Sequence, residues 1–291
     1  MAFAVSVAAA ADTPQTASNL SAAEIVDKNV AARGGLEAWR AVKTMSLTGK
    51  LGAGGNQRAT LQVPTPGPTS ASGRRSSIRP TSTRPAEEIQ LPFLMELARP
   101  RKMRFELEFN GQTAIQVYDG ANGWKLRPFL NRRVVEPYTA DEMKTASMQA
   151  DLDGPLVDYA AKGTRIELAG MEKVEDRNAY KIKLTMKDGQ SIHVWVDALT
   201  FLEKKIEGQP RRLDGVDHPV EVYFSDYRPV SGLMIPFTLE TKVLRVSQTV
   251  QGFKDPTVPP EKVNIEKVVI NPKFDDAVFS KPQIGVSSNA K

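Results

Sequence analysis

The sequence predicts a mainly β protein of the α+β class, in which an antiparallel sheet is accompanied by a few short helices. Three observations predict this class. Long stretches alternate apolar and polar residues, as do strands with one buried and one solvated face. Asn-Gly and Asp-Gly pairs, which favour tight hairpin turns, separate several of these stretches. Capped helical patterns occur in only two places, near the N-terminus and in the middle of the chain.

Length and composition are those of a globular protein. The chain has 291 residues, of which 41% are hydrophobic and 25% charged. We expect a single domain over residues 19–281. A residual signal peptide or disordered N-terminus over residues 1–18 precedes it, and a disordered tail over residues 282–291 follows.

The excess of positive charge is confined to one segment. The formal net charge is +5, and residues 53–86 contain five Arg with no Lys, Asp or Glu. Of the 39 basic residues, the 34 outside this segment equal the 34 acidic ones. A body without net charge gives no support for a nucleic-acid partner.

The N-terminus and the absence of Cys bear on compartment and chemistry. Without Cys there can be no disulfide, thiolate metal site, Cys nucleophile or lipidated N-terminal Cys. Phe3 to Ala11 reads FAVSVAAAA, and Ala8 and Ala10 offer an A-x-A cleavage site. We therefore expect an exported, soluble periplasmic protein; the alternative is a short Ala-rich tail. No run approaches the ~18 apolar residues of a membrane span.

Two helices are expected at the start of the domain. Ser21-Ala22-Ala23-Glu24 has the form of a capping box, and apolar residues follow at helical spacing. Gly34-Gly35 ends this helix, because glycine adopts the left-handed conformation at little cost. Leu36 to Val42 predicts a second, short helix.

Strands follow on both sides of an unusual insertion. Thr44–Leu51 alternates, whereas residues 53–86 are rich in Arg, Pro and Ser and predict a disordered insertion. This insertion is either a solvated loop or a surface for anionic lipid headgroups or RNA. After it, Met103–Phe109 shows the cleanest alternation in the chain, and Asn110-Gly111 predicts a hairpin turn.

A helical insertion divides the strands into two groups. Thr139-Ala140-Asp141-Glu142 predicts a helix start, and the helix runs to about Gln149. Asp153-Gly154-Pro155 breaks it, and Leu156–Ala161 predicts a further helical piece. From Thr164 onward a meander of short strands is expected, giving roughly ten or eleven strands in all.

No constellation predicts catalysis, a metal or a cofactor. The only histidines are His193 and His218, and neither lies in a metal-binding motif such as H-E-x-x-H. No G-x-S-x-G elbow is present, and the Gly cluster after Leu51 lacks the strand-to-helix context of a phosphate loop. We therefore expect a protein that is not an enzyme, with no metal site and no cofactor.

The apolar face of the sheet is the remaining candidate for function. The short helices cannot cover roughly ten strands, so the sheet either packs on itself or leaves a pocket open. Strand alternation nominates cavity residues, and the helical insertion nominates residues of a lid with Asp153-Gly154-Pro155 as its hinge. The cavity candidates are Leu91, Phe93, Met95, Met103, Phe105, Leu107, Phe109, Trp124 and Leu126; the lid candidates are Met143, Met148, Leu152, Leu156 and Tyr159.

Five segments resemble the outer-membrane lipoprotein-sorting, LolA/LolB-like family of bacterial periplasmic carriers. The most specific is MELARPRKMRFELEF followed by YDGANGW, within Leu91–Phe129. The others are Leu20–Leu51, with its GGLEAWRAV motif, Ala150–Gly163, Val230–Thr241 and Phe274–Pro282. The resemblance covers most of the chain and is strongest to the uncharacterised branch of the family.

The resemblance implies an incomplete antiparallel β-barrel, with short helices forming a lid over an apolar cavity. It implies a periplasmic carrier of lipid or lipoprotein acyl chains in outer membrane biogenesis, with peripheral membrane contact possible. It assigns no residue a role. The alternatives are an envelope protein-docking or sensor module of the same fold without cargo, and a hydrolase of envelope lipids.

Overall fold

The computed structural model describes residues 20–53, 89–128, 132–213, 215–244 and 260–283. The expected N-terminal segment and almost all of the Arg-rich insertion lie outside these residues. So does most of the expected C-terminal tail, although Pro282 is described and is buried.

Three short α-helices and one 3-10 helix accompany the strands in the described chain. They are α1 (Ala22–Ala32), α2 (Leu36–Ala41), α3 (Ala140–Gln149) and η2 (Asp276–Phe279). Capping boxes at Ser21 and Thr139 start α1 and α3, with Glu24 and Glu142 as the reciprocal partners. Both predicted helix starts are therefore confirmed.

The strands form one antiparallel sheet. Their order in space is β6-β5-β4-β3-β2-β1-β13-β12-β11-β10-β9-β8-β7, so only the β1–β13 pairing joins strands far apart in sequence. The strands are β1 (Thr44–Ala53), β2 (Ile89–Ala98), β3 (Lys102–Phe109), β4 (Gln112–Tyr118), β5 (Gly123–Arg127), β6 (Arg132–Pro137), β7 (Arg165–Val174), β8 (Arg177–Thr185), β9 (Ser191–Asp197), β10 (Glu203–Leu213), β11 (Val216–Val230), β12 (Leu233–Val243) and β13 (Glu261–Ile270).

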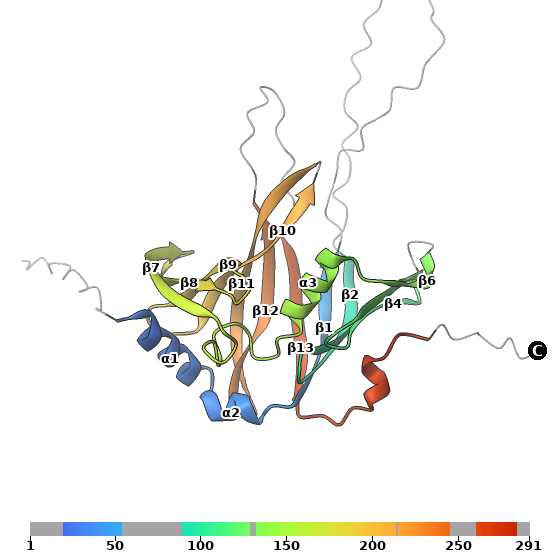
Figure 1. Cartoon of the computed structure of the whole chain (residues 1–291), viewed down its shortest axis with the longest axis horizontal. Coiled ribbons are helices and arrows are strands. Elements are labelled where there is room, and N and C mark those ends of the chain that lie inside the picture. Colours follow the sequence, from blue (N-terminus) through green and yellow to red (C-terminus); the bar gives the residue numbers. More distant parts are fainter. Residues whose placement is uncertain (1–19, 54–88, 129–131, 214, 245–259, 284–291) are drawn as a thin grey trace, which may run out of the picture.

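The sheet bends around the helices without closing. Figure 1 shows α1 and α2 beside one half of the sheet and α3 in front of its centre. We call the face that packs against these helices the inner face. The two edge strands, β6 and β7, are not paired with each other, so the described sheet is an open barrel.

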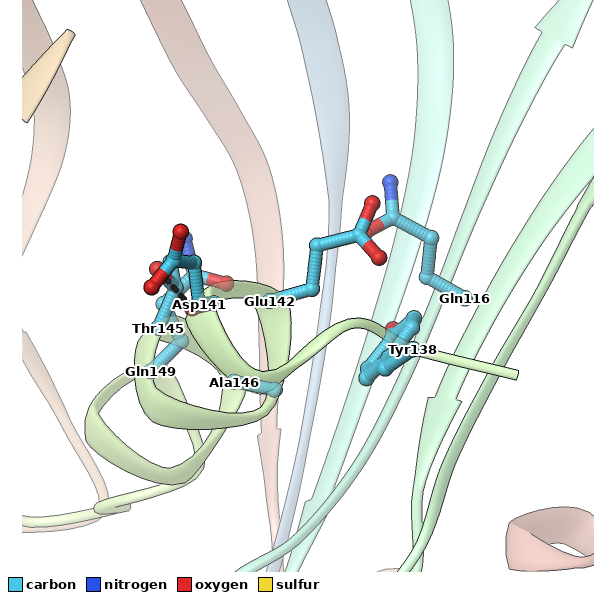
Figure 2. Close-up of a pocket in the computed structure, with 7 residues that line it drawn as sticks. All are labelled: Gln116, Tyr138, Asp141, Glu142, Thr145, Ala146 and Gln149. Atoms are coloured by element: carbon cyan, nitrogen blue, oxygen red, sulfur yellow. Dashed lines mark hydrogen bonds between the residues drawn. The ribbon is translucent and has the colours of Figure 1, made fainter. Parts of the chain in front are cut away.

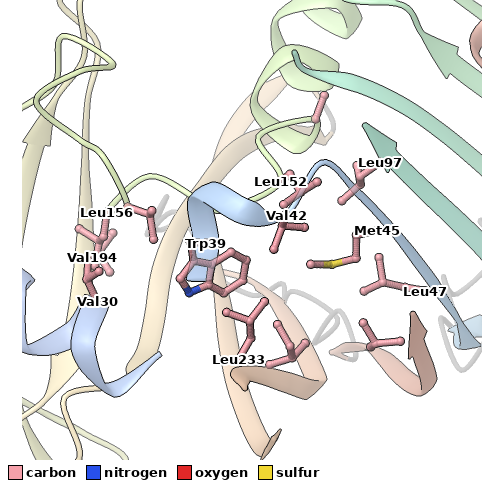
Figure 3. Packing of buried hydrophobic residues seen from close by; sticks show 14 of the residues in the cluster. Val30, Trp39, Val42, Met45, Leu47, Leu97, Leu152, Leu156, Val194 and Leu233 are labelled. Carbon is pink, nitrogen blue, oxygen red and sulfur yellow. The ribbon is translucent and has the colours of Figure 1, made fainter. Parts of the chain in front are cut away.

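The main core fills the space between the inner face and the helices. It joins Ile25 and Val26 of α1, Trp39 of α2 and inward side chains from both halves of the sheet, such as Leu97 and Val194. Figure 3 shows Trp39, Val42, Met45 and Leu233 packed together near the middle of this layer. Burial of these apolar side chains from both halves stabilises the sheet as one unit.

Two predictions of secondary structure differ from the structure, and one turn prediction is confirmed. The structure has thirteen strands rather than ten or eleven, and β6 is among those that the sequence did not predict. The prediction of a helix over Leu156–Ala161 is wrong, because residues 152–163 form successive turns. The Asn110-Gly111 hairpin is confirmed, since both residues have positive φ, 49° and 69°, as this turn type requires.

Candidate ligand-binding site

The inner face of β1, β2, β3 and β4 is built in rows of side chains that run across the strands. One row joins Met45, Leu97, Met103 and Tyr118, which are 3%, 6%, 1% and 6% exposed. This row lies at the end of the sheet nearest α2, where Trp39 and Val42 cover it. It belongs to the core.

The following rows are covered less completely. The next row joins Leu47, Met95, Phe105, Gln116 and Lys125, and the one after it joins Phe93 and Leu107. We call the half-buried apolar side chains of these rows and of the adjoining strands the apolar band. The apolar band consists of Leu51, Met95, Phe105, Leu107, Leu239 and Val263.

The apolar band is continuous across five strands. Leu51 pairs with Val263, and Val263 pairs with Leu239. The Phe93 and Phe105 rings stack with their centroids 5.9 Å apart. Half-buried apolar side chains grouped on one face are the surface that an apolar ligand binds most readily.

Seven of the nine cavity candidates share the inner face. Met95, Phe105, Leu107 and Phe109 are half-buried there, whereas Leu91, Phe93 and Met103 are 9%, 7% and 1% exposed. The strand alternation therefore predicted their common orientation. Only the four half-buried residues present substantial surface to a ligand.

Trp124 and Leu126 lie on the opposite face of the sheet. Trp124 is paired with Val117 and Leu126 with Ile115, and these neighbours pack outward against the segment around η2. Phe279 of η2 and the nearby Phe274 pack in one cluster with Trp124, Val117 and Ile115. The structure does not bring these two candidates together with the other seven.

Helix α3 covers part of the inner face and is attached to it by few groups. Ala146 is buried in the core, Met143 is half-buried against it, and the Met148 sulfur accepts a hydrogen bond from Gln209 at 3.1 Å. The Glu142 carboxylate forms an ion pair with the ammonium of Lys125, an inward side chain of β5 that is 7% exposed. Both lid candidates of α3 therefore contact the layer beneath it.

Glu142 has two structural tasks. Besides pairing with Lys125 it accepts a hydrogen bond from the Thr139 N–H at 2.9 Å. Burial alone would raise the pKa of Glu142, but the hydrogen bonds from Lys125 and Thr139 hold its pKa below the usual value. The carboxylate thus stays charged and holds the start of α3 to the sheet.

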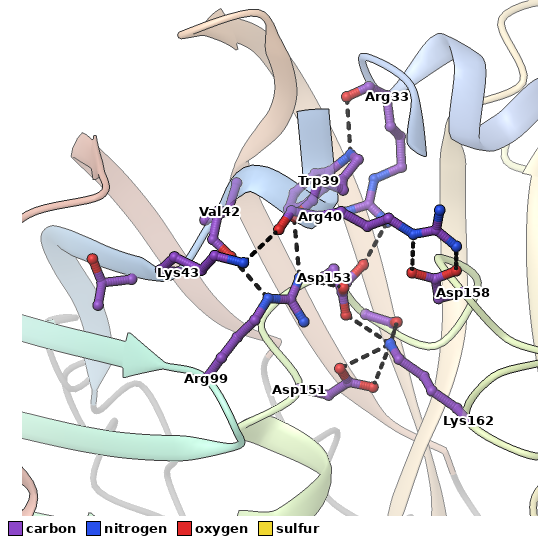
Figure 4. Close-up of polar contacts among 12 residues, drawn as sticks. Arg33, Trp39, Arg40, Val42, Lys43, Arg99, Asp151, Asp153, Asp158 and Lys162 are labelled. Carbon is purple, nitrogen blue, oxygen red and sulfur yellow. Dashed lines mark hydrogen bonds and ion pairs between the residues drawn. The ribbon is translucent and has the colours of Figure 1, made fainter. Parts of the chain in front are cut away.

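The segment after α3 is anchored far more firmly. The Asp153 carboxylate, 1% exposed, accepts from Arg99 at 2.6 Å and from Lys162 at 2.7 Å (Figure 4). Arg33 donates to the Asp153 carbonyl at 2.9 Å and to Glu203 at 3.0 Å. Instead of a free hinge, the structure shows Asp153 at the centre of a buried ion network.

The remaining lid candidates belong to this anchored segment. Leu156 is fully buried, Leu152 is 8% exposed, and Tyr159 packs half-buried against the core. Arg40 of α2 adds a bidentate pair to Asp158, at 2.9 and 2.7 Å. A movable cover would therefore be α3 alone, with residues 151–163 as its fixed base.

The two acids of the network differ in pKa because of their surroundings. Burial raises the pKa of Asp151 to about 6, although Lys162 opposes this effect. Burial also acts on Asp153, but hydrogen bonds from Asp151, Lys162 and Arg99 lower its pKa to about 2. Lys162 lies between them and donates to Asp151 at 2.9 Å.

A pocket of about 180 Å³ lies between α3 and β4. It is lined by Gln116, Tyr138, Asp141, Glu142, Thr145, Ala146 and Gln149. Figure 2 shows these side chains, among them Glu142 of α3 and Gln116 of β4. Since Gln116 lies next to Phe105 in register, this polar pocket adjoins the apolar band.

The histidines lie outside this site. His193 contacts Glu207 at 2.9 Å, and His218 contacts the Leu244 carbonyl at 3.1 Å. Among the described residues, no three His, Cys, Asp or Glu side chains are grouped as they would be around a metal ion. No helix within the described ranges has the length and apolar character needed to cross a membrane.

Comparison with solved structures identifies the fold of this chain. A LolA superfamily protein from Nitrosomonas europaea superposes with a TM-score of 0.51 at 13% identity, covering 90% of this chain and 98% of its own. The chain has the LolA-like fold. No family model matches the sequence, and no curated protein matches it.

Two further structures share the LolA-like fold. One is named as an outer membrane lipoprotein-sorting protein domain from Vibrio parahaemolyticus, with a TM-score of 0.50, 11% identity, and coverage of 89% and 95% of the two chains. The other is a DUF1329 family protein from Desulfovibrio piger, with a TM-score of 0.50, 14% identity, and coverage of 89% and 97%. The predicted fold class and resemblance are thus confirmed at the level of the fold.

Proposed function

We propose that the protein is a non-enzymatic carrier that binds lipid or lipoprotein acyl chains against its inner face. The observation that carries the proposal is the apolar band, which groups half-buried apolar side chains on the face that the helices cover incompletely. Each buried methylene contributes about 0.8 kcal/mol, so one acyl chain gains enough to offset the costs of association.

Helix α3 is the cover in this proposal. Its links to the inner face are the Lys125–Glu142 pair, the Gln209–Met148 hydrogen bond and the packing of Ala146 and Met143. The ion network at Asp153 holds residues 151–163 in place while α3 moves. An entering chain would occupy the apolar band and displace the Met side chains, whose flexibility suits varied ligands.

The likeness of fold to structures named as LolA superfamily and lipoprotein-sorting proteins supports this proposal. We place the carrier in the periplasm, as the A-x-A site within Phe3–Ala11 indicates. Its task there would be transport of acyl chains toward the outer membrane.

Replacement of Phe105 with Asp tests the proposal. Phe105 is half-buried at the centre of the apolar band, and a carboxylate there would have to be desolvated by a bound chain. We expect the folded variant to lose uptake of the neutral fluorescent probe N-phenyl-1-naphthylamine. The matched control is Val269→Asp on the outer face, where the side chain is 36% exposed. Equal uptake by both variants would reject the proposal.

A second candidate is docking of an envelope protein, and the edge strand β7 favours it. Nearly every residue of β7 is exposed, and Leu168 and Met171 are 42% and 43% exposed. Such an edge can pair with an extended strand of a partner. A photo-crosslinking residue at Met171 would then give one discrete adduct in cells, whereas the same residue at Leu199, 77% exposed, would not. Absence of an adduct at Met171 would reject this candidate.

A further inference from the structure

The polar pocket between α3 and β4 contains side chains whose hydrogen-bonding capacity is unused. Among the described residues, the Tyr138 hydroxyl oxygen is buried and has no partner. No hydrogen bond to the side chains of Gln116, Asp141 or Gln149 occurs in this part of the chain either. A buried polar group without a partner, as the Tyr138 hydroxyl is, is rare in native structures and calls for a ligand or ordered water.

Gln116 is the most informative of these residues. It occupies an inward position of β4, between Phe105 of β3 and Lys125 of β5 in register. The Gln116 side chain is half-buried there, and partial burial of an amide without a protein partner costs free energy. An apolar residue would avoid this cost if the face served only for packing.

The charges around the pocket select the ligand. Its lining carries two carboxylates, Asp141 and Glu142, and Lys125 neutralises only Glu142. Asp141 is exposed at the mouth of the pocket and forms no ion pair with the residues that the structure describes. The surplus negative charge disfavours a phosphate or carboxylate and favours a cation.

The size of the pocket suits a small headgroup. In a cavity of this kind roughly 10–15 Å³ is needed for one water molecule, so 180 Å³ accommodates a small polar group. The side chains around it offer a carboxylate, carboxamide oxygens and a phenolic oxygen. A primary ammonium has three donors and no acceptor, and it matches this set.

We propose that this pocket binds the primary ammonium headgroup of an amphiphile whose chain lies on the apolar band. The assignment rests on the proposed carrier function and deepens it, because it names the class of cargo as amino-lipid. Asp141 supplies the charge, Gln116 supplies a neutral acceptor, and the Tyr138 hydroxyl is buried close to them. The chain and the headgroup then occupy adjoining surfaces, joined at the Phe105–Gln116 row.

Three ligands of equal chain length test the headgroup assignment. Dodecylamine, dodecanol and dodecanoate are each titrated at pH 7.5 against protein loaded with N-phenyl-1-naphthylamine, and displacement gives the dissociation constants. We expect dodecylamine to bind about tenfold more tightly than dodecanol, which corresponds to about 1.4 kcal/mol, and dodecanoate to bind most weakly.

Single substitutions test whether the preference for the amine over the alcohol arises in this pocket. Asp141→Asn should reduce the ratio between amine and alcohol to below about threefold, while leaving binding of the neutral probe unchanged. Gln116→Leu should also lower the ratio but strengthen dodecanol binding. The control is Asp176→Asn, since Asp176 is an exposed acid in the β7–β8 turn without an ion pair in the described part of the chain, and its loss changes net charge equally.

Each outcome is decisive. Equal affinity for the three ligands, or preference for dodecanoate, overturns the headgroup site and leaves the carrier function standing. A preference for the amine that persists in Asp141→Asn and Gln116→Leu overturns the placement in this pocket. Failure to bind the neutral probe at all overturns the carrier function, and the headgroup site with it.

Discussion

Replacement of Asp153 with Asn should destabilise the fold strongly, because this carboxylate links residues 151–163 to the turn between β2 and β3. It is 1% exposed and accepts short hydrogen bonds from Arg99, which precedes β3, and from Lys162, which lies near the end of the turns. Loss of one partner of a buried ion pair typically costs 3–5 kcal/mol. Arg99 is 32% exposed and Asn retains one acceptor, so we expect a loss of about 3 kcal/mol.

Urea denaturation followed by tryptophan fluorescence measures this loss. The urea concentration at the midpoint of unfolding should fall, while the slope of the free energy of unfolding against urea stays constant. The melting temperature should fall by roughly 5–10 °C. The control is Glu266→Gln, which removes a pair with Lys50 whose side chains are 50% and 57% exposed. That change should cost less than about 0.5 kcal/mol. A loss below about 1 kcal/mol in Asp153→Asn would refute the view that this network anchors residues 151–163.

Three further predictions concern the same layer. Asp151 keeps its proton to about pH 6 in the folded state but releases it near pH 4 when unfolded, so its contribution to stability is present at acidic pH and is lost as pH rises through 6. The free energy of unfolding of Asp151→Asn, relative to the unchanged protein, should therefore rise by about 2 kcal/mol between pH 4.5 and 7.5; a flat difference would contradict the raised pKa. Glu142→Gln keeps a capping side chain but loses the charge that pairs with Lys125, so bound probe should dissociate several-fold faster in stopped-flow displacement than from Lys144→Gln, and an unchanged rate would argue against α3 as the cover. Gly123→Ala places a methyl group against the Tyr138 ring and should cost about 1–3 kcal/mol in urea denaturation, whereas Gly189→Ala, with open space around it, should show only the smaller effect of its positive φ.

The sequence predicts the inner face well where a strand is long. Met103 to Phe109 alternates over seven residues, and register with β2 confirms the shared orientation of its apolar side chains. The capping boxes at Ser21 and Thr139 are equally local signals, since each is complete within four residues. Such features depend on short-range geometry and can be read without tertiary information.

The sequence does not predict the face on which a side chain lies when the residues that cover it are distant in the sequence. β5 is five residues long, and its apolar Trp124 and Leu126 suggest an inward face. In the structure Lys125 points inward to Glu142, because Phe274 and Phe279 cover the outer side of this strand. Nothing near Trp124 in the sequence signals a cover that lies about 150 residues further on.

The polar features of the site are the least predictable. Asp153-Gly154-Pro155 has the composition of a flexible turn, yet Arg33 and Arg99 from distant parts of the chain and Lys162 from the same run of turns all contact it. The pocket beside Gln116 likewise depends on the placement of α3 over β4. These contacts arise from long-range packing, so residue type alone does not reveal them.

The most direct test of the central claim is lipid extraction with native mass spectrometry of the protein purified from a periplasm. The carrier proposal predicts a copurifying acyl species in the unchanged protein and in Val269→Asp, and its absence from folded Phe105→Asp. A bare protein mass in all three, with no uptake of added fatty amine or lipopeptide, would contradict the claim that the apolar band is a ligand-binding surface.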